Sequence, residues 1–181
     1  MTLEEYFGKM RGGAKIPPRV SLAELGWSWL GSAIGIGLCA ILSSRYFEPH
    51  DLSLLIGSFG ASAVLVYGAI KSPLAQPRNL VGGHIISGLI GVACHQLVGQ
   101  TVWLAAALAV SIAIVAMLAT RTLHPPGGAT ALIAVIGGQK IYSLGYLYAL
   151  VPAGAGAIVL LIVALAVNNL SRNRSYPEFW L

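Results

Sequence analysis

The stretch RTLHPPGGATALIAVIGG, residues 121–138, places an arginine, a histidine and two prolines directly before a short run of small and aliphatic residues. In a soluble protein such a pattern of polar residues and prolines indicates a surface turn. Here it follows residues 102–119, which carry no charged side chain. The meaning of the stretch therefore depends on whether water or lipid surrounds the chain.

Composition identifies the surrounding solvent as lipid. The chain has 181 residues, of which 56% are hydrophobic and 9% charged, and its mean hydropathy is +0.78. Ordinary globular domains are about 25% charged, so a soluble fold of this size could not cover its surface with so few charged side chains. No long polar insertion interrupts the chain. We therefore expect one compact membrane domain.

The apolar runs divide the chain into membrane-spanning segments. Runs of about 18 or more residues can span a bilayer as helices. The runs that meet this length are 22–43, 52–70, 80–98, 102–119 and 145–169. A further run, 128–139, covers only about half of the hydrocarbon core. We expect a membrane domain over 22–170, a cytoplasmic N-terminal segment over 1–21 and a cytoplasmic C-terminal tail over 171–181.

Lysines and arginines favour six crossings with both termini in the cytoplasm. Under this arrangement all but two of the 11 basic residues lie inside, as the positive-inside bias predicts. The inside set is Lys9, Arg11, Lys15, Arg19, Lys71, Arg78, Arg121, Arg172 and Arg174, and the outside set is Arg45 and Lys140. If segment 128–139 did not cross, the C-terminal arginines would lie outside. We expect a multi-pass protein of a cell membrane, with the prokaryotic inner membrane favoured.

An internal similarity links two of the segments. Residues 59–71 align with 127–139 at an offset of 128 − 60 = 68, so that Gly60, Ala61, Ser62 and Ala63 correspond to Gly128, Ala129, Thr130 and Ala131. Alternatively, the similarity arose by chance, because the chain contains 22 glycines. Each copy is the middle member of a three-helix set, and three crossings per set would invert the second set. Inverted repeats with interrupted segments point to a transport site near the midplane.

The prolines suggest how the fifth segment enters the membrane. Pro125 and Pro126 cannot donate backbone hydrogen bonds, and they push the preceding residues into extended conformations. We expect 121–127 to enter as an extended strand, and a half-helix to run outward from Gly128. Irregular backbone at this depth is tolerated only against protein or a water-filled cavity.

The first repeat offers a matching half-helix. GSFG, residues 57–60, would break the second span and leave a half-helix that runs inward from Gly60. The two helix N-termini would then face each other, with Ser62 and Thr130 as hydroxyl donors. Helix N-termini carry partial positive charge and attract anions. The alternative is that these small residues serve only close helix packing.

Three basic side chains are candidates for an anion vestibule. Arg78 and Asn79 stand at the start of the third span, and Arg121 and His124 precede the fifth segment. Arg78, Arg121 and His124 share the cytoplasmic side in the six-crossing arrangement and would concentrate anions there. Alternatively, Arg78 is only a positive-inside anchor.

His84 and His95 are 11 residues apart, on one face of the third span. Ionisable residues inside a membrane are functional candidates that line cavities or relay protons. We expect His84 to hydrogen-bond the cargo or carry a proton. A neutral histidine bonded to a backbone carbonyl is the structural alternative for both residues.

Enzymatic chemistry and metal binding find no support in the residue inventory. None of the acidic residues, Glu4, Glu5, Glu24, Glu48, Asp51 and Glu178, falls in the interior of a span, since Glu24 is only the third residue of the first. The sequence has no paired carboxylates, nucleophile elbow or phosphate loop. The histidine spacing is not that of metal ligands, and a lack of embedded carboxylates argues against cation pumping. We expect no enzyme activity, no cofactor and no metal, which leaves a small anion as cargo.

Two further stretches concern helix shape and packing. Pro152, Gly154 and Gly156 favour a kink in the last span. GSAIG, residues 31–35, is a face of small residues that suits either an intramolecular contact or a dimer.

Three motifs resemble the HPP family of integral membrane proteins, which is named for a His-Pro-Pro tripeptide. The motifs are FGASAVLVY, SPLAQPRNLVGGHIISGLIG and LHPPGGATALIAVIGG, and the resemblance spans about residues 25–170. Members characterised in plastids and cyanobacteria carry nitrite, so the resemblance implies nitrite transport. The matching positions are Gly60, Ala61, Ser62, Gln76, Pro77, Arg78, Asn79, Gly82, Gly83, His84, His124, Pro125, Pro126, Gly128, Ala129 and Thr130. Gly127 stands where family sequences often have alanine, and we expect it to loosen the turn.

Taken together, the sequence predicts an all-α polytopic membrane protein with six transmembrane segments, arranged as two inverted three-helix repeats with broken or half-length second and fifth helices. We expect it to transport a small monovalent anion, nitrite first, without nucleic-acid partners; a homo-oligomer is left open. The alternatives are a permease for another anion or its neutral acid, and a non-transporting membrane scaffold. The predicted binding residues are Gly60, Ala61, Ser62, Arg78, Asn79, His84, Arg121, His124, Gly128, Ala129 and Thr130.

Overall fold

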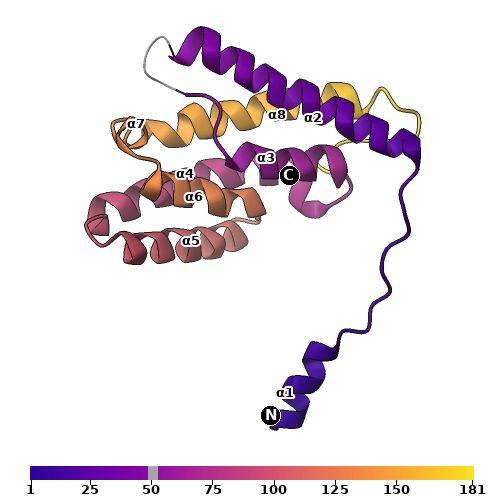
Figure 1. The fold of residues 1–181 in the computed structure, drawn as a ribbon, viewed down its shortest axis with the longest axis horizontal. Coiled ribbons are helices and arrows are strands. Elements are labelled where there is room, and N and C mark those ends of the chain that lie inside the picture. Colours follow the sequence, from indigo (N-terminus) through magenta and orange to yellow (C-terminus); the bar gives the residue numbers. More distant parts are fainter. Residues whose placement is uncertain (49–52) are drawn as a thin grey trace.

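The computed structural model describes residues 1–48 and 53–181, and the secondary structure in this part of the chain is helical throughout (Figure 1). Among the described residues, four helical stretches are long and apolar enough to cross a membrane. They are Leu22–Phe47, Pro77–Val98, Val102–Ala119 and Ala149–Asn168. The first comprises α2 (Leu22–Leu42) and a π-helical continuation, Ser43–Phe47. The second and third are α4 and α5. These lengths confirm an all-helical membrane protein.

Two shorter apolar helices lie between the long ones. Helix α3 (Ser58–Ala63) continues as a π-helical turn to Gly68, and α6 comprises Pro125–Ile136. Each is about half the length that a bilayer requires. The second and fifth apolar segments are therefore half-length, as expected, although the first residue of the expected 52–70 span lies outside the described residues.

Helix α6 begins earlier than the prolines suggested. Pro125 and Pro126 are its first two residues, and His124 is its N-cap with an extended backbone. The prediction of an extended strand over 121–127 is therefore wrong for Pro125, Pro126 and Gly127, which are helical. Proline suits the first turn of a helix, because no N–H partner is required there and its fixed φ already fits the helix.

The last span is interrupted, as Pro152 and its neighbouring glycines indicated. Residues Ala149–Gly154 form an irregular turn in which Val151 has non-helical φ and ψ of −137° and 116°. Helix α8 (Ala155–Asn168) then completes the span. A four-residue helix, α7 (Gln139–Tyr142), connects α6 to this region.

Short helices also occur outside the spans. Helix α1 (Leu3–Gly8) has a capping box formed by Thr2 and Glu5 and contains no buried residue. It extends into a 3₁₀ turn, Lys9–Arg11. Another 3₁₀ turn, Pro73–Ala75, connects the end of α3 to α4.

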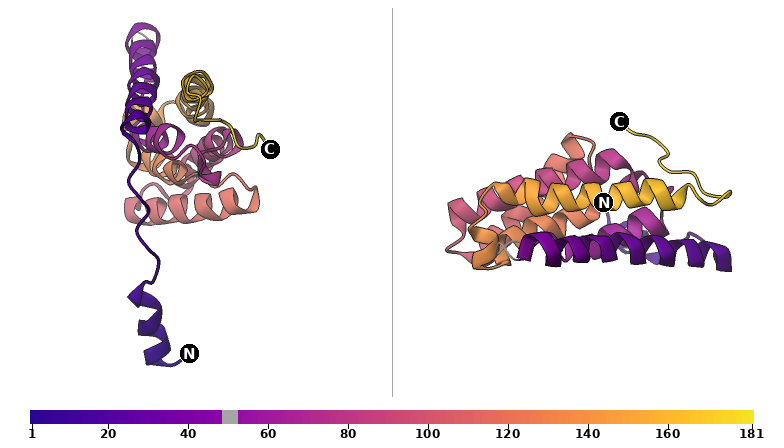
Figure 2. Two further views of the ribbon diagram at one scale, coloured as in Figure 1. Left: turned by 90° about the vertical axis from the view of Figure 1, so that its right-hand side faces the viewer. Right: turned by 90° about the horizontal axis from the view of Figure 1, so that it is seen from above.

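The helices pack in two groups that meet at the half-length pair. Helices α2 and α8 run side by side in opposite directions, and α4, α5 and α6 pack against one another (Figures 1 and 2). Helices α3 and α6 start beside each other near the middle of the bundle and run away in opposite directions (Figure 1). The N-terminal turns of two short helices therefore lie together in the interior.

Tyr67 fixes α3 to both α2 and α8. Its ring lies against Gly31, where an added Cβ would come within 2.7 Å of the ring, and its hydroxyl contacts Gly35. The same hydroxyl donates a hydrogen bond to the Leu160 carbonyl at 3.0 Å. The face of small residues at 31–35 thus packs against Tyr67 of the same chain. At Gly31 and Gly35 the contact is therefore intramolecular.

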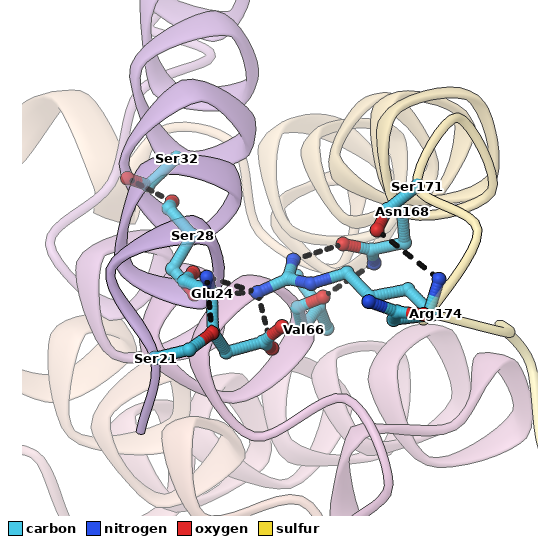
Figure 3. A network of polar contacts seen from close by, with 9 residues as sticks. Ser21, Glu24, Ser28, Ser32, Val66, Asn168, Ser171 and Arg174 are labelled. Carbon is cyan, nitrogen blue, oxygen red and sulfur yellow. Dashed lines mark hydrogen bonds and ion pairs between the residues drawn. The ribbon is translucent and has the colours of Figure 1, made fainter. Parts of the chain in front are cut away.

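The C-terminal tail is tied to the end of the bundle by Arg174 (Figure 3). Its Nη2 donates to Glu24 Oε1 at 2.6 Å and to Ser28 Oγ at 2.7 Å, both on α2. Its Nη1 donates to Asn168 Oδ1 on α8 at 2.9 Å, and Asn168 in turn donates to the Val66 carbonyl on the π-helical continuation of α3. Arg174, which was predicted only to lie on the cytoplasmic side, is a buried structural link between three helices.

Candidate functional site

A chain of buried polar side chains lies where α3 and α6 start. Its members share near-complete burial, at most 1% exposed each, and are Ser58, Ser62, His84, His124 and Thr130. We call them the histidine cluster. The serines come from α3, His84 from α4, and His124 and Thr130 from the beginning of α6. The cluster therefore joins residues from three helices.

His84 is bonded on both sides of its ring. Its Nε2 lies 2.8 Å from Ser62 Oγ, and its Nδ1 lies 2.7 Å from Thr130 Oγ1. Ser62 and Thr130 are the two positions that correspond in the internal similarity, since 130 − 62 = 68. Thr130 Oγ1 also lies 2.9 Å from Ser58 Oγ. Equivalent residues of the two short helices thus bond to one imidazole from opposite sides.

His124 extends the chain toward the connection between α3 and α4. Its Nε2 lies 2.9 Å from Ser62 Oγ, and its Nδ1 lies 2.8 Å from the Leu74 carbonyl oxygen. We expected His124 in a cytoplasmic vestibule with the arginines, but its side chain is 0% exposed. The reason is its place as the N-cap of α6, which directs the ring toward α3 rather than outward.

Close helix approach holds the cluster in place. A Cβ added at Gly83 would lie 2.6 Å from His124 Cβ, and one added at Gly127 would lie 2.6 Å from Ser87 Oγ. Gly127 is therefore needed for contact between α6 and α4, whereas the sequence suggested only a looser turn. The Phe59 ring packs edge-on against His84, with ring centroids 5.3 Å apart.

The cluster is closed in this conformation. An apolar groove between α2 and α3 is lined by Trp29, Gly60 and Tyr67, among others, and a second groove is lined by Val110, Gly128 and Leu132. Among the described residues, the linings of these two grooves include none of the cluster side chains. A guest must therefore displace or rearrange the hydrogen bonds that now satisfy the five residues.

We expected the helix N-termini to attract the anion, but backbone N–H groups at the two helix starts already have other partners. The first two residues of α6 are prolines without an N–H, and the Gly127 N–H donates to the His124 carbonyl at 2.8 Å. In α3, the Phe59 N–H donates to the Ile56 carbonyl at 3.0 Å. These amides are already engaged, so the donors of the site are side chains.

The remaining predicted residues divide into two groups. Gly60, Ala61 and Ala129 lie on the outer surface of their helices, and Gly128 is half-buried. The others lie around the 120–124 connection: the Arg78 guanidinium donates to the Thr120 carbonyl at 2.7 Å, and Asn79 donates to the Leu123 carbonyl at 2.8 Å. Arg121 follows Thr120 directly and is exposed. Arg78 and Arg121 thus share one end of the bundle.

His95 does not belong to the cluster. It lies at the last turn of α4, where its ring stacks on Tyr142 with centroids 3.9 Å apart. Among the residues that the structure describes, none forms a hydrogen bond with its Nδ1. Sharing a helix face with His84 therefore did not place it in the same site.

Sequence reasoning missed two participants in the cluster. Ser58 lies one helical turn before Ser62, and this spacing on a helix could have identified it. The Leu74 carbonyl is a backbone group, and no sequence pattern would have indicated that it pairs with His124.

The fold and the cluster together define a class: a helical membrane protein with two short helices that start beside a buried polar site. The sequence matches the family described as HPP, transmembrane region, over residues 17–177. The chain belongs to this family of membrane proteins.

Two curated proteins of Dictyostelium discoideum, each named a transmembrane protein, are similar to this chain. One is 51% identical over 180 residues, which cover 97% of this chain and 57% of the relative. The other is 45% identical over 185 residues, covering 99% of this chain and 65% of the relative. The chain thus spans about three fifths of the length of these relatives. Both come from a eukaryote, so they do not support the prokaryotic inner membrane. No solved structure matches the chain.

Proposed function

We propose that this protein transports a small monovalent anion, with nitrite as the first candidate, and that the histidine cluster binds it. The proposal rests on one observation above the others. Ser62 and Thr130, at equivalent positions of two oppositely directed short helices, bond to opposite nitrogens of His84. This places two hydroxyl groups and two imidazoles at one buried point, where they can donate hydrogen bonds to an oxyanion.

The charge balance of the cluster favours an anion over a cation. The cluster contains no carboxylate, and its two titratable members are histidines. Both helix starts contribute partial positive charge to the same point. A buried cation would find no compensating negative charge there, whereas an anion meets donors and dipoles of the right sign.

The arrangement of the helices supports two inverted repeats with six crossings. If α2, α3 and α4 correspond to α5, α6 and α8, a two-fold relation exchanges the α2–α8 pair with the α5–α4 pair. Both pairs are in contact, and α3 contacts its own equivalent, α6. Paired, interrupted segments near the midplane are the usual position of a transporter site.

Arg78 and Arg121 are proposed to attract the anion toward the cluster. Both lie near the 120–124 connection, which leads directly to His124. In the six-crossing arrangement this end and both chain termini face the cytoplasm, in agreement with the positive-inside bias. The cargo would pass without chemical conversion, so we propose a transporter rather than an enzyme.

Nitrite uptake into proteoliposomes tests the proposal. Thr130→Val keeps the shape of the side chain and removes the hydroxyl that bonds to His84 Nδ1. We expect it to lower protein-dependent uptake at least tenfold, while Thr130→Ser, which keeps the hydroxyl, retains most of it. Thr101→Val is the matched control, because Thr101 is exposed and its side chain does not cap α5. Competition by nitrate, formate, chloride and bicarbonate ranks the anions.

A membrane scaffold is the second candidate, favoured by the closed and fully bonded state of the cluster. A satisfied buried polar network can serve only to rigidify a core. In that case purified protein would give no nitrite flux above that of empty vesicles. Flux that is unchanged by Thr130→Val would reject the cluster as the site and leave transport through another route.

A further inference from the structure

We propose that the histidine cluster takes up one proton with each anion, so that the protein is an electroneutral proton–anion symporter. This inference rests on the proposed transport function and adds its coupling ion. It follows from the directions that the hydrogen bonds of the cluster must take, and from the lack of a carboxylate in the cluster.

With both imidazoles neutral, one order of the protons pairs every ring nitrogen, and in it the Thr130 hydroxyl donates to His84 rather than to Ser58 Oγ. The Leu74 carbonyl can only accept, so His124 Nδ1 carries a hydrogen and donates to it. His124 Nε2 then accepts from the Ser62 hydroxyl. Ser62 has no second hydrogen, so His84 Nε2 donates to Ser62. His84 Nδ1 is left to accept from the Thr130 hydroxyl.

One added proton fits this chain with only hydroxyl rotations. When His84 Nδ1 is protonated it donates to Thr130 Oγ1, and the Thr130 hydroxyl turns to Ser58 Oγ, 2.9 Å away. When the proton is on His124 instead, His124 Nε2 donates to Ser62 Oγ. Every member of the cluster therefore keeps a partner in both protonated states.

Ser62 can pass the proton between the two imidazoles. The His84 Nε2–H bond breaks as a new O–H bond forms on Ser62. The original O–H bond of Ser62 breaks at the same time, and a N–H bond forms on His124 Nε2. The distances of 2.8 and 2.9 Å suit this exchange. One positive charge moves from one ring to the other, and Ser62 ends with one hydrogen, as it began.

The positive charge needs a partner, and the described residues around the cluster supply none. The elements packed around His84 present Ser58, Phe59 and Ser62 from α3, and Thr130 and His124 from α6. His124 is the titratable group among them. Directly before the last span, the Tyr148 hydroxyl donates to the Thr130 carbonyl at 2.9 Å. A buried imidazolium without a counter-charge is costly, and a bound anion removes that cost. Proton and anion therefore bind together.

Uptake of nitrite under separated gradients tests the coupling. The pH difference and the membrane potential are imposed independently on proteoliposomes, the latter with potassium and valinomycin, and empty vesicles correct for permeation of nitrous acid. We expect initial protein-dependent uptake to rise several-fold when the outside is one pH unit more acidic. At equal pH, we expect a membrane potential of either sign to leave uptake unchanged.

Calorimetry provides a readout that does not depend on transport. Nitrite is titrated into purified protein in buffers with different ionisation enthalpies. The slope of the observed enthalpy against buffer enthalpy gives the number of protons bound, which we expect to be about one per anion.

In Ser62→Ala, which disconnects the imidazoles, we expect the response of uptake to pH to be lost. Ser111→Ala, on the exposed face of α5, should behave as the native protein.

The outcomes separate this inference from the proposed function. Nitrite uptake that follows the membrane potential and ignores pH, with no proton bound in calorimetry, overturns the coupling and leaves anion transport standing. Absence of any protein-dependent uptake overturns the proposed function and the coupling with it. A pH response that persists in Ser62→Ala rejects the cluster as the proton carrier.

Discussion

Arg174 and Glu24 form an ion pair of 2.6 Å between residues 150 positions apart in the sequence. The arginine side chain is 1% exposed and the glutamate side chain 32%. The pair connects the tail that follows α8 to the first turn of α2, at the same end of the bundle as the start of α4 (Figures 1 and 3). It therefore holds the first and last spans together.

Removing the charge of Glu24 is expected to destabilise the fold. In Glu24→Gln the guanidinium keeps its bonds to Ser28 and Asn168 but loses its counter-charge. Removing one partner from a buried pair costs about 3–5 kcal/mol. Because Glu24 is partly exposed, we expect a loss of about 2 kcal/mol in the free energy of unfolding, measured in detergent. Glu4→Gln, at an exposed position of α1, is the control. Equal stability of the two variants would contradict the structural role of the pair.

Gly156 is expected to tolerate no larger side chain. A Cβ at this position would overlap the Phe59 ring, which in turn packs on His84. Overpacking of a filled core costs about 1–3 kcal/mol, so we expect Gly156→Ala to lower thermal stability and nitrite uptake together. Gly37→Ala should be neutral or slightly stabilising, because nothing lies within 4 Å of its Cβ position. Adding Phe59→Leu should restore stability to Gly156→Ala, and its failure to do so would show that another contact is responsible.

Cysteine labelling is expected to reveal six crossings. In a background without Cys39 and Cys94, single cysteines replace Arg19, Lys140 and Arg172. An impermeant thiol reagent should reach positions 19 and 172 from the same side of the membrane and position 140 from the other. If α6 did not carry the chain across, positions 19 and 140 would be labelled together and position 172 from the opposite side.

The sequence was sufficient to predict the elements that depend on hydrophobic length. The span over 102–119 is the observed α5, and the two short helices lie where GSFG and the His-Pro-Pro stretch interrupt the apolar runs. Length and interruption are properties of the chain itself, so they can be read without knowing its contacts. The internal similarity between Ser62 and Thr130 also predicted which hydroxyls would come together.

Contacts between helices could not be predicted in the same way. His124 looked like a boundary residue, because its N-cap position and the packing of α6 on α4, through Gly83 and Gly127, together carry its ring into the interior. Arg174 was predicted only as one of the basic residues on the cytoplasmic side, for a related reason: its partner Glu24 is distant in sequence and unremarkable by itself. Both residues acquire their roles from neighbours that no local pattern identifies.

Tyr67 limits which parts of the bundle can move relative to one another. Its ring occupies the space left by Gly31 and its hydroxyl bonds to the Leu160 backbone, so α2, the end of α3 and α8 are coupled as one mechanical body. Under the proposed transport function, exposure of the buried histidines to alternate sides of the membrane would come from displacement of α4, α5 and α6 against that body. The interrupted backbone at Val151, next to α4, gives this displacement a natural pivot.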